Sequence, residues 1–428
     1  MLNNQDYTLT AIISANRFGQ ASIDVSNVVA ELNIYENIKN PFLSGKISIL
    51  DDNGISNAIK FKGTETLTIT LSNEELGVAP ITKIFIITQV SDSIKINDQS
   101  EMIVLSLVEP HLFYSRAVPI SKTYNGTPDQ IISKLITDDI INKTIDNRSG
   151  QSSVQSAMKV TFPYIEPLQA VELIRGRMTT TEGFPYVLYS TLHDDAIIMD
   201  NLGEALRRDT WNEKTPFTYS QAGSGGNDTI GKLTSIEKFI RPNADDTLST
   251  LLSGAVGSKF SAFDTMYGQE VYSNHHDINE TIKSLVSDDE QGQSIFDEDF
   301  LIANQKINDI NSRNIFQVVS SNAYEGYNGF NDEPIKPGLH KTKIQAKSIL
   351  AAMDKNLMVI QIPGTLFLVH KKSSVGTRIK VQFASNNIEE AEDLSKSGDY
   401  LITAIRHVFR DNKHTVSATV TKLVEKRI

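Results

Sequence analysis

Two short stretches near opposite ends of the chain share one pattern: "FIITQVS", residues 85–91, and "YLITAIR", residues 400–406. Each contains an aromatic residue, an aliphatic residue, Ile-Thr, one variable residue and a β-branched aliphatic residue. A polar turn follows each stretch. After the turn comes a second apolar stretch, "EMIVLSLVE" ending at Glu109 and "TVSATVTKLVE" ending at Glu425. We predict two β-hairpins of the same design, with their closing Leu-Val-Glu tripeptides at equivalent positions.

The alternation of side chains supports strands in both copies. In the last stretch Val416, Ala418 and Val420 alternate with Thr and Ser residues, which is the period of a half-buried strand. A further strand, introduced by Gly-Thr, precedes each hairpin. In "GTETLTITLS" and "GTRIKVQFAS" three apolar side chains share one face: Leu67, Ile69 and Leu71 in the first, and Ile379, Val381 and Phe383 in the second. The ordered set indicates one β module that is present twice.

The bulk composition is that of a folded globular protein. The chain has 428 residues, of which 39% are hydrophobic and 22% charged. Its apolar runs are far shorter than the ~20 residues that a transmembrane helix needs. The first ten residues, "MLNNQDYTLT", have no basic segment followed by an apolar core, so we expect no secretory signal. The chain has no cysteine, which excludes disulfides and thiolate metal sites and is compatible with assembly in a reducing cytoplasm.

The net charge of the chain is -11, from 41 basic and 52 acidic residues. A protein that grips nucleic acid needs a basic face for the phosphates, so this balance argues against that function. It remains compatible with a protein that nucleic acid passes without binding.

We predict an α+β, mainly β fold with four parts. Residues 1–110 read as a β domain. Residues 111–222 read as a small α+β domain, with helices that begin near Pro128 and Pro167 and a hairpin that turns over His193-Asp194-Asp195. After the linker-like "SQAGSGGND", residues 228–245 and 336–428 form a second β domain, and 246–335 form a polar insertion of mixed helix and loop, with helical patches in "INETIKSLV" and "DFLIANQKI".

No stretch of the sequence has the residues of a known catalytic or phosphate-binding motif. The glycine cluster Gly223-Ser224-Gly225-Gly226 follows no clear strand and lacks the Lys-Ser/Thr of a phosphate-binding loop, so a linker is the better interpretation. His275-His276-Asp277 is the nearest match to a metal site. Adjacent histidines face opposite sides of a helix or strand, and a polar loop is favoured.

The remaining candidates have simpler structural interpretations. His193-Asp194-Asp195 fits a turn. The acidic sets 288–290 and 297–299 lack the spacing of a calcium loop and fit a solvated surface. The single Trp211 gives little support to a carbohydrate platform, and Tyr324, Tyr327 and Phe330 fit a flexible loop better than a partner-binding one. We therefore predict no catalytic, cofactor-binding or metal-binding residues, no cofactor and no enzymatic activity.

The order of these features resembles the baseplate hub proteins of contractile-tailed bacteriophages and the matching N-terminal part of type VI secretion spike proteins. The resemblance covers most of the chain. It lies in the strand pattern "VVAELNIYENIKNPFLSGKISILDDNG", in "EPLQAVELIRGRM" with "EGFPYVLYS", in "IGKLTSIEKFIRP", and in the C-terminal run from "IQIPG" through "GTRIKVQF" and "GDYLITAIRHVF" to "HTVSATV".

The resemblance implies that the two β domains are tail-tube-like and related by duplication. Three chains then present six similar domains in a ring, on which a six-fold tail tube stacks, while the other side keeps the three-fold symmetry of a trimeric spike. It implies a homotrimer in the virion tail, assembled in the host cytoplasm. The expected partners are the tube or a tube-initiator protein, other baseplate components and a spike on a separate polypeptide, because the chain stops after the second hairpin. DNA would pass through without specific binding.

Two other functions stay open from the sequence. A tail-associated cell-wall hydrolase would need a defined acid pair or metal site, and nothing among the 52 acidic residues singles out a pair. A receptor-binding tail protein would use the Tyr/Gly/Asn loop around residue 327 to contact host sugar.

Overall fold

The computed structural model of the chain describes residues 6–15, 22–97, 100–140, 143–155, 157–219, 229–241, 247–285, 301–307, 309–319, 338–385, 392–393 and 396–423. In this part of the chain no helix is long and apolar enough to cross a membrane. The linker-like stretch 220–228, the two acidic sets and the Tyr/Gly/Asn loop all lie outside the described residues.

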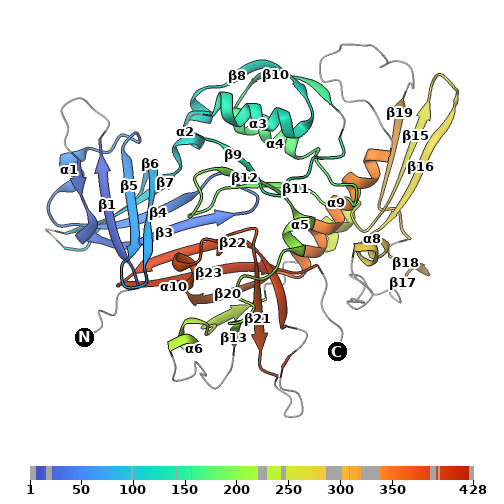
Figure 1. Cartoon of the computed structure of the whole chain (residues 1–428). Helices are drawn as coiled ribbons and strands as arrows, with labels where there is room; N and C mark the ends of the chain where they lie inside the picture. The colour runs from blue at the N-terminus through green and yellow to red at the C-terminus, as the bar shows by residue number, and fades with distance from the viewer. Residues whose placement is uncertain are drawn as a thin grey trace.

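One 13-stranded sheet runs through the molecule, and the predicted α+β, mainly β fold is confirmed (Figure 1). The order of its strands is β14 (Lys238–Ile240), β20 (Met358–Pro363), β23 (Lys413–Thr421), β22 (Gly398–Arg410), β3 (Val29–Asn37), β4 (Ser44–Asp51), β7 (Glu101–Val108), β6 (Val78–Lys95), β5 (Thr66–Asn73), β1 (Thr8–Ser14) and β2 (Ile23–Asp24). Outside this path, β21 (Arg378–Phe383) pairs with β22, and β13 (Phe217–Tyr219) pairs with β21.

The two halves of this sheet have the same internal order. We define the first module as β3, β4, the short helix α1 (Ile55–Ile59), β5, β6 and β7, and the second module as β14, β20, the short helix α10 (Thr365–Val369), β21, β22 and β23. The sheet order within the first is β3-β4-β7-β6-β5, and within the second it is β14-β20-β23-β22-β21. The repeated order confirms that one β module is present twice.

The Ile-Thr pair of the repeated sequence marks the same irregularity in both copies. The pairing of β6 with β7 shifts register at Thr88, and that of β22 with β23 shifts at Thr403. Thr88 Oγ1 donates to the Ser106 carbonyl (3.3 Å), and Thr403 Oγ1 donates to the Thr419 carbonyl (3.1 Å). A bulge bends the strand at a fixed place, so the repeated Thr is a structural feature of the module.

The Leu-Val-Glu prediction is wrong. Leu107 pairs with Ile87, one residue before the first bulge, and the residue that pairs with Ile402 is Val420. Val420 is therefore the equivalent of Leu107, and the later Leu-Val-Glu begins only after β23 has ended at Thr421. The matching tripeptides are a coincidence of sequence.

The residues between the modules form a smaller α+β part with its own core. Its elements are α2 (Pro110–Ala117), β8 (Ile120–Gly126), α3 (Pro128–Asp139), β9 (Ile145–Asn147), β10 (Met158–Ile165), α4 (Pro167–Arg175), β11 (Tyr186–Tyr189), β12 (Ile197–Asn201) and α5 (Leu202–Arg207). Helix α3 begins with proline after the N-cap Thr127 and buries one apolar side, as the sequence predicts. The predicted hairpin over His193 is also confirmed, because β11 and β12 pair antiparallel around that loop.

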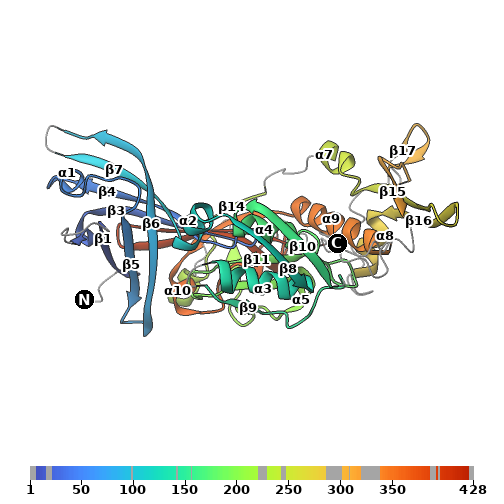
Figure 2. The ribbon, with the colours of Figure 1, turned by 90° about the horizontal axis from the view of Figure 1, so that it is seen from above.

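The segment between β14 and β20 projects from the end of the molecule opposite the first module (Figure 2). It contains more strand than the sequence predicts: β15 (Gly257–Asp264), β16 (Gln269–Asp277) and β19 (Arg313–Val319) form one sheet. Helix α8 (Ile278–Leu285) lies in the predicted "INETIKSLV". The predicted helix in "DFLIANQKI" is wrong, since β17 (Leu301–Ile302) and β18 (Gln305–Lys306) form a hairpin there. The short helices α6 (Thr229–Leu233) and α7 (Thr247–Leu252) flank β14, and α9 (Gly338–Lys355) leads into β20.

Candidate assembly site at the joint between the modules

The two modules are joined edge to edge within one chain. Beyond the bulge at Thr403, residues 404–410 of β22 pair antiparallel with residues 31–37 of β3. The long strand of the second module therefore continues the sheet into the edge strand of the first module. The core of the first module also receives Phe409 from β22, which is almost fully buried beside Tyr7.

The outward face of this joint carries charged contacts. Arg406 Nε donates to Asn33 Oδ1 at 2.8 Å. The guanidinium groups of Arg406 and Arg410 each lie 3.7 Å from the carboxylate of Glu31. These side chains are partly exposed, so the contacts specify register more than they add stability.

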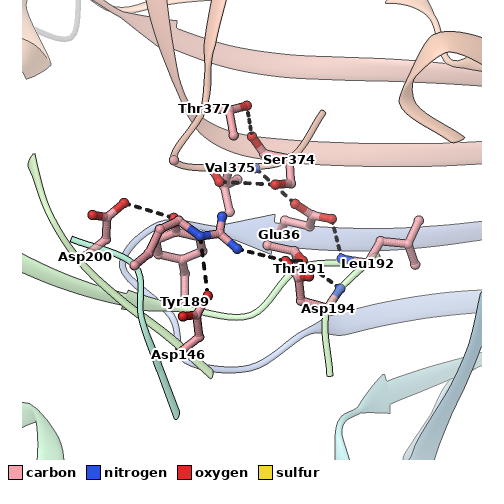
Figure 3. Close-up of polar contacts among 12 residues, drawn as sticks. Glu36, Asp146, Tyr189, Thr191, Leu192, Asp194, Asp200, Ser374, Val375 and Thr377 are labelled. Atoms are coloured by element: carbon pink, nitrogen blue, oxygen red, sulfur yellow. Dashed lines mark hydrogen bonds and ion pairs between the residues drawn. The ribbon is translucent and has the colours of Figure 1, made fainter. Parts of the chain in front are cut away.

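Glu36 lies on the inward face of the same joint and connects it to two further segments (Figure 3). Its side chain is buried. It accepts hydrogen bonds from the backbone amides of Leu192 (2.7 Å) and Val375 (3.2 Å), and His407 Nε2 lies 3.4 Å away. Leu192 belongs to the β11–β12 loop and Val375 precedes β21. One carboxylate thus ties the first module to the middle part and to the second module.

The β11–β12 loop is itself held by polar contacts next to Glu36. Thr191 Oγ1 donates to Asp194 Oδ2, and the Asp194 amide donates back to Thr191 Oγ1 (Figure 3). Arg148 Nη2 donates to Asp194 at 3.0 Å and its Nε lies 3.6 Å from Asp146. Asp194 therefore has a structural role in the loop, as the turn interpretation predicts.

A second buried carboxylate, Asp200, fixes the other side of the loop. It accepts two hydrogen bonds from the guanidinium of Arg208, at 2.5 and 2.6 Å, and one from Tyr189 Oη at 3.3 Å. The side chain of Asp200 is fully buried while that of Arg208 is partly exposed. Burial raises the pKa of the Tyr189 hydroxyl, so it stays protonated as a donor to Asp200.

The rings of His407, Phe409 and His414 stack on one another next to Glu36. The rings of Phe409 and His414 stack at 4.2 Å, and His414 Nε2 lies 3.2 Å from His407 Nδ1. A Cβ at Gly364 would lie 2.4 Å from the His414 ring, so only glycine leaves room for it. Complete burial lowers the pKa of His414 well below its ordinary value.

The stability of the protein is expected to fall between pH 7 and pH 5. Burial lowers the pKa of His111, His193, His276 and His414, so the unfolded chain binds protons below pH ~6.5 that the native state does not. Each such histidine therefore makes unfolding more favourable as the pH falls through its unfolded-state pKa. Urea denaturation at both pH values measures the loss. An equal free energy of unfolding at pH 5 and pH 7 would contradict it. His275→Gln, at an exposed histidine, is the control for the substitution of a histidine as such.

The structure separates the other residues that the sequence singles out. His275 and His276 lie on opposite faces of β16, as predicted for adjacent histidines, but the predicted loop is wrong. His276 Nε2 lies 2.6 Å from Ser348 Oγ of α9, whereas His275 faces Asn311. Trp211 packs edge-on against Phe217 and Phe367, so it is part of a core and not a carbohydrate platform. Among the described residues, no group of three or more His, Cys, Asp or Glu side chains is placed to hold a metal ion.

Glu36 and Asp200 are the polar residues that sequence reasoning missed. The sequence does contain a signal for Glu36. Along the predicted strand it follows Leu32 and Ile34 at every second position, so the three side chains lie on the same face. A carboxylate on the inward face of a strand indicates a buried partner. Chemically the site contains buried acceptors that are saturated by backbone amides and a guanidinium, which is an arrangement that holds segments together.

Several strands of the large sheet have an open edge in the described part of the chain, and two of these edges, on β14 and on β6, carry exposed apolar side chains. Strand β14 ends the sheet at one side. In the first module, β5 covers β6 only as far as Ile86, so residues 89–95 of β6 pair with β7 alone. Both edges carry exposed isoleucines: Ile94 is 58% exposed and Ile240 is 48% exposed.

No family model matches the sequence, and a comparison with curated proteins found no match. Solved structures do match over nearly the whole chain. A tail protein from Neisseria meningitidis MC58 superposes with a TM-score of 0.56 at 10% identity, over 97% of this chain and 96% of that one. The 43 kDa tail protein of prophage MuSo2 from Shewanella oneidensis superposes with a TM-score of 0.52 at 11% identity, over 97% and 98%. The chain therefore has the fold of these tail proteins.

Proposed function

We propose that the protein is a structural baseplate hub of a phage tail, in which three copies form a ring between the tail tube and a central spike. The observation that carries this proposal is the joint between β22 and β3, where two copies of one β module add edge to edge inside a single chain. The fold shared with tail proteins supports it.

Repeated modules that join by their edges suit a ring. A heterologous contact between unlike edges either closes on itself or grows without end. Each chain supplies two modules, so a ring of three chains presents six similar domains to a six-fold tube. The same ring keeps three-fold symmetry for a trimeric spike on a separate polypeptide. The unpaired edges, which favour aggregation in a free monomer, become the contacts between chains.

The other parts of the proposal follow from this role. The protein would act in the virion tail after assembly in the host cytoplasm, without enzymatic activity. DNA would pass the ring without specific binding, in keeping with the net charge of -11. We further propose that 1–110 and the split region 228–245 with 336–428 are the tube-like domains, that 111–222 is the middle domain, and that the insertion 246–335 contacts a neighbouring baseplate component.

The native mass of the purified protein tests the ring. Light scattering over a range of concentrations should give a species of three times the 47.5 kDa chain mass. Electron micrographs of that species should show closed rings with six similar lobes. A stable dimer or an open filament would contradict the three-copy ring. A single-chain mass at every concentration would contradict self-association of the free protein and would justify tests of glycan binding and cell-wall hydrolysis.

A further inference from the structure

The two open edges are the structural equivalents of the two strands that meet in the internal joint. Strand β6 occupies in the first module the place of β22 in the second, and β14 occupies in the second the place of β3 in the first. In the internal joint, β22 of the second module pairs with β3 of the first. The two strands left over, β6 and β14, are open at the corresponding edges.

We propose that β14 of one copy pairs antiparallel with residues 94–96 of the next copy, in the register of the internal joint. The partner is thus a second copy of this chain, and the contact is heterologous. The proposal rests on the proposed ring and deepens it, because it names the strands that close the ring.

The register follows from pairings within the two modules. Ile240 pairs with Val359, Val359 with Thr419, and Thr419 with Ala404, the residue after the bulged Thr403. Three equivalent pairings connect Asn33 with Gln89, the residue after the bulged Thr88. Asn33 pairs with Lys46, Lys46 with Ser106, and Ser106 with Gln89. Ile240 is therefore the equivalent of Asn33.

The position opposite Ile240 is found in the same way. In the internal joint Asn33 pairs with Val408, and Val408 pairs with Thr415, four residues before Thr419. In the first module, Met102 lies four residues before Ser106 and pairs with Ile94. Ile94 is therefore the equivalent of Val408. The joint between copies places Ile94 opposite Ile240, Lys95 opposite Phe239, and Ile96 opposite Lys238.

The side chains on these edges suit this register. The exposed Ile94 and Ile240 would cover each other, and removing these apolar side chains from water favours the contact. Asp92 and Lys238 lie on the same face as this isoleucine pair, and neither has an ion-pair partner among the described residues. In the internal joint the equivalent positions are Arg406 and Glu31, which interact. The basic residue lies on β22 in the internal joint but on β14 in the proposed joint. Each edge strand therefore meets the opposite charge on its own partner and would meet a like charge on the other.

Engineered cysteines test the register, because the natural chain has none. The double variant Ile94→Cys/Ile240→Cys should form disulfides between copies on mild oxidation, since directly opposite residues have Cβ atoms about 4.5–5.5 Å apart. Non-reducing electrophoresis should show dimers and trimers and nothing larger. The internal equivalent, Asn33→Cys/Val408→Cys, is the positive control and should form a disulfide within one chain. Ile94→Cys/Phe239→Cys is shifted by one residue, which places the thiols on opposite faces, and should cross-link poorly.

The outcomes distinguish the register from the ring. Disulfides in the Ile94/Ile240 variant together with a native mass of three chains support both proposals. A three-chain mass without these disulfides overturns the register and leaves the ring standing. A single-chain mass without disulfides overturns both. As a second measure, Ile240→Asp should raise the concentration for half-assembly at least tenfold, whereas Ile302→Asp, at an isoleucine 43% exposed on β17, should not change it. Equal effects of the two substitutions would also contradict the proposed joint.

Discussion

Replacing Glu36 by alanine is expected to lower the free energy of unfolding by about 3–5 kcal/mol, a large part of the total for a typical domain. The carboxylate accepts hydrogen bonds from two backbone amides, those of Leu192 and Val375, and both amides come from other parts of the chain. Its removal leaves two buried N–H groups without an acceptor, and each unsatisfied group costs about 1–3 kcal/mol. Urea denaturation at fixed protein concentration, followed by tryptophan fluorescence and circular dichroism, measures the loss.

The matched control is Glu31→Ala in the same strand. Glu31 lies on the outward face, where it contacts Arg406 and Arg410 at 3.7 Å and remains partly exposed. An exposed ion pair of this kind contributes about 0–1 kcal/mol, so the control should change stability little. A loss below about 1 kcal/mol for Glu36→Ala, or equal losses for the two variants, would show that Glu36 does not hold the three segments together.

The modules themselves were predictable from the sequence because strand alternation is a local signal. Leu67, Ile69 and Leu71 alternate with threonines and are fully buried, and so are Val416, Ala418 and Val420. The bulge at Thr403 was visible only as a repeated residue. Its meaning came from the pairing of β22 with β23. A repeated sequence therefore predicts a repeated element, while its geometry depends on the partner strand.

The joint between the modules was not predictable, since nothing local in residues 404–410 specifies a partner in residues 31–37. Pairing over such separation is decided by the whole fold and not by strand propensity. The hairpin of β17 and β18 was missed for a different reason. Its apolar residues are few, and Ala303 and Asn304 both adopt positive φ, a turn that Ala does not signal.

Replacing Gly376 by alanine is expected to destabilise the protein by about 3 kcal/mol or more, from two independent causes. Gly376 has φ +77°, a conformation that costs an L-residue roughly 1–2 kcal/mol. In addition, an added Cβ would lie 2.2 Å from Tyr189 Oη and 2.6 Å from its Cζ. Tyr189 is fully buried and its hydroxyl donates to Asp200, so the ring has no room to withdraw. Overpacking of this kind costs typically 1–3 kcal/mol.

The control Gly77→Ala separates the two causes. Gly77 has a similar φ of +65°, and an added Cβ there meets nothing within 4 Å. The difference between the two losses in free energy of unfolding measures the clash with Tyr189 alone. In a Tyr189→Leu background the cost of Gly376→Ala should shrink toward that of Gly77→Ala, because the atoms in conflict are gone. An unchanged cost in that background would mean that backbone strain accounts for the whole effect.

Gly63 is the first module's equivalent of Gly376, since each begins the Gly-Thr pair that precedes its strand. Gly63 precedes the equivalent strand of the first module with φ +85°, and its missing Cβ would lie 3.3 Å from the Thr88 carbonyl. Both modules thus need glycine for the backbone conformation. Only in the second module does the same glycine also make room for a side chain from the middle part of the chain. Gly63→Ala should therefore cost less than Gly376→Ala and more than Gly77→Ala. That order would show that the glycine of the second module, unlike that of the first, also makes room for a side chain of the middle part.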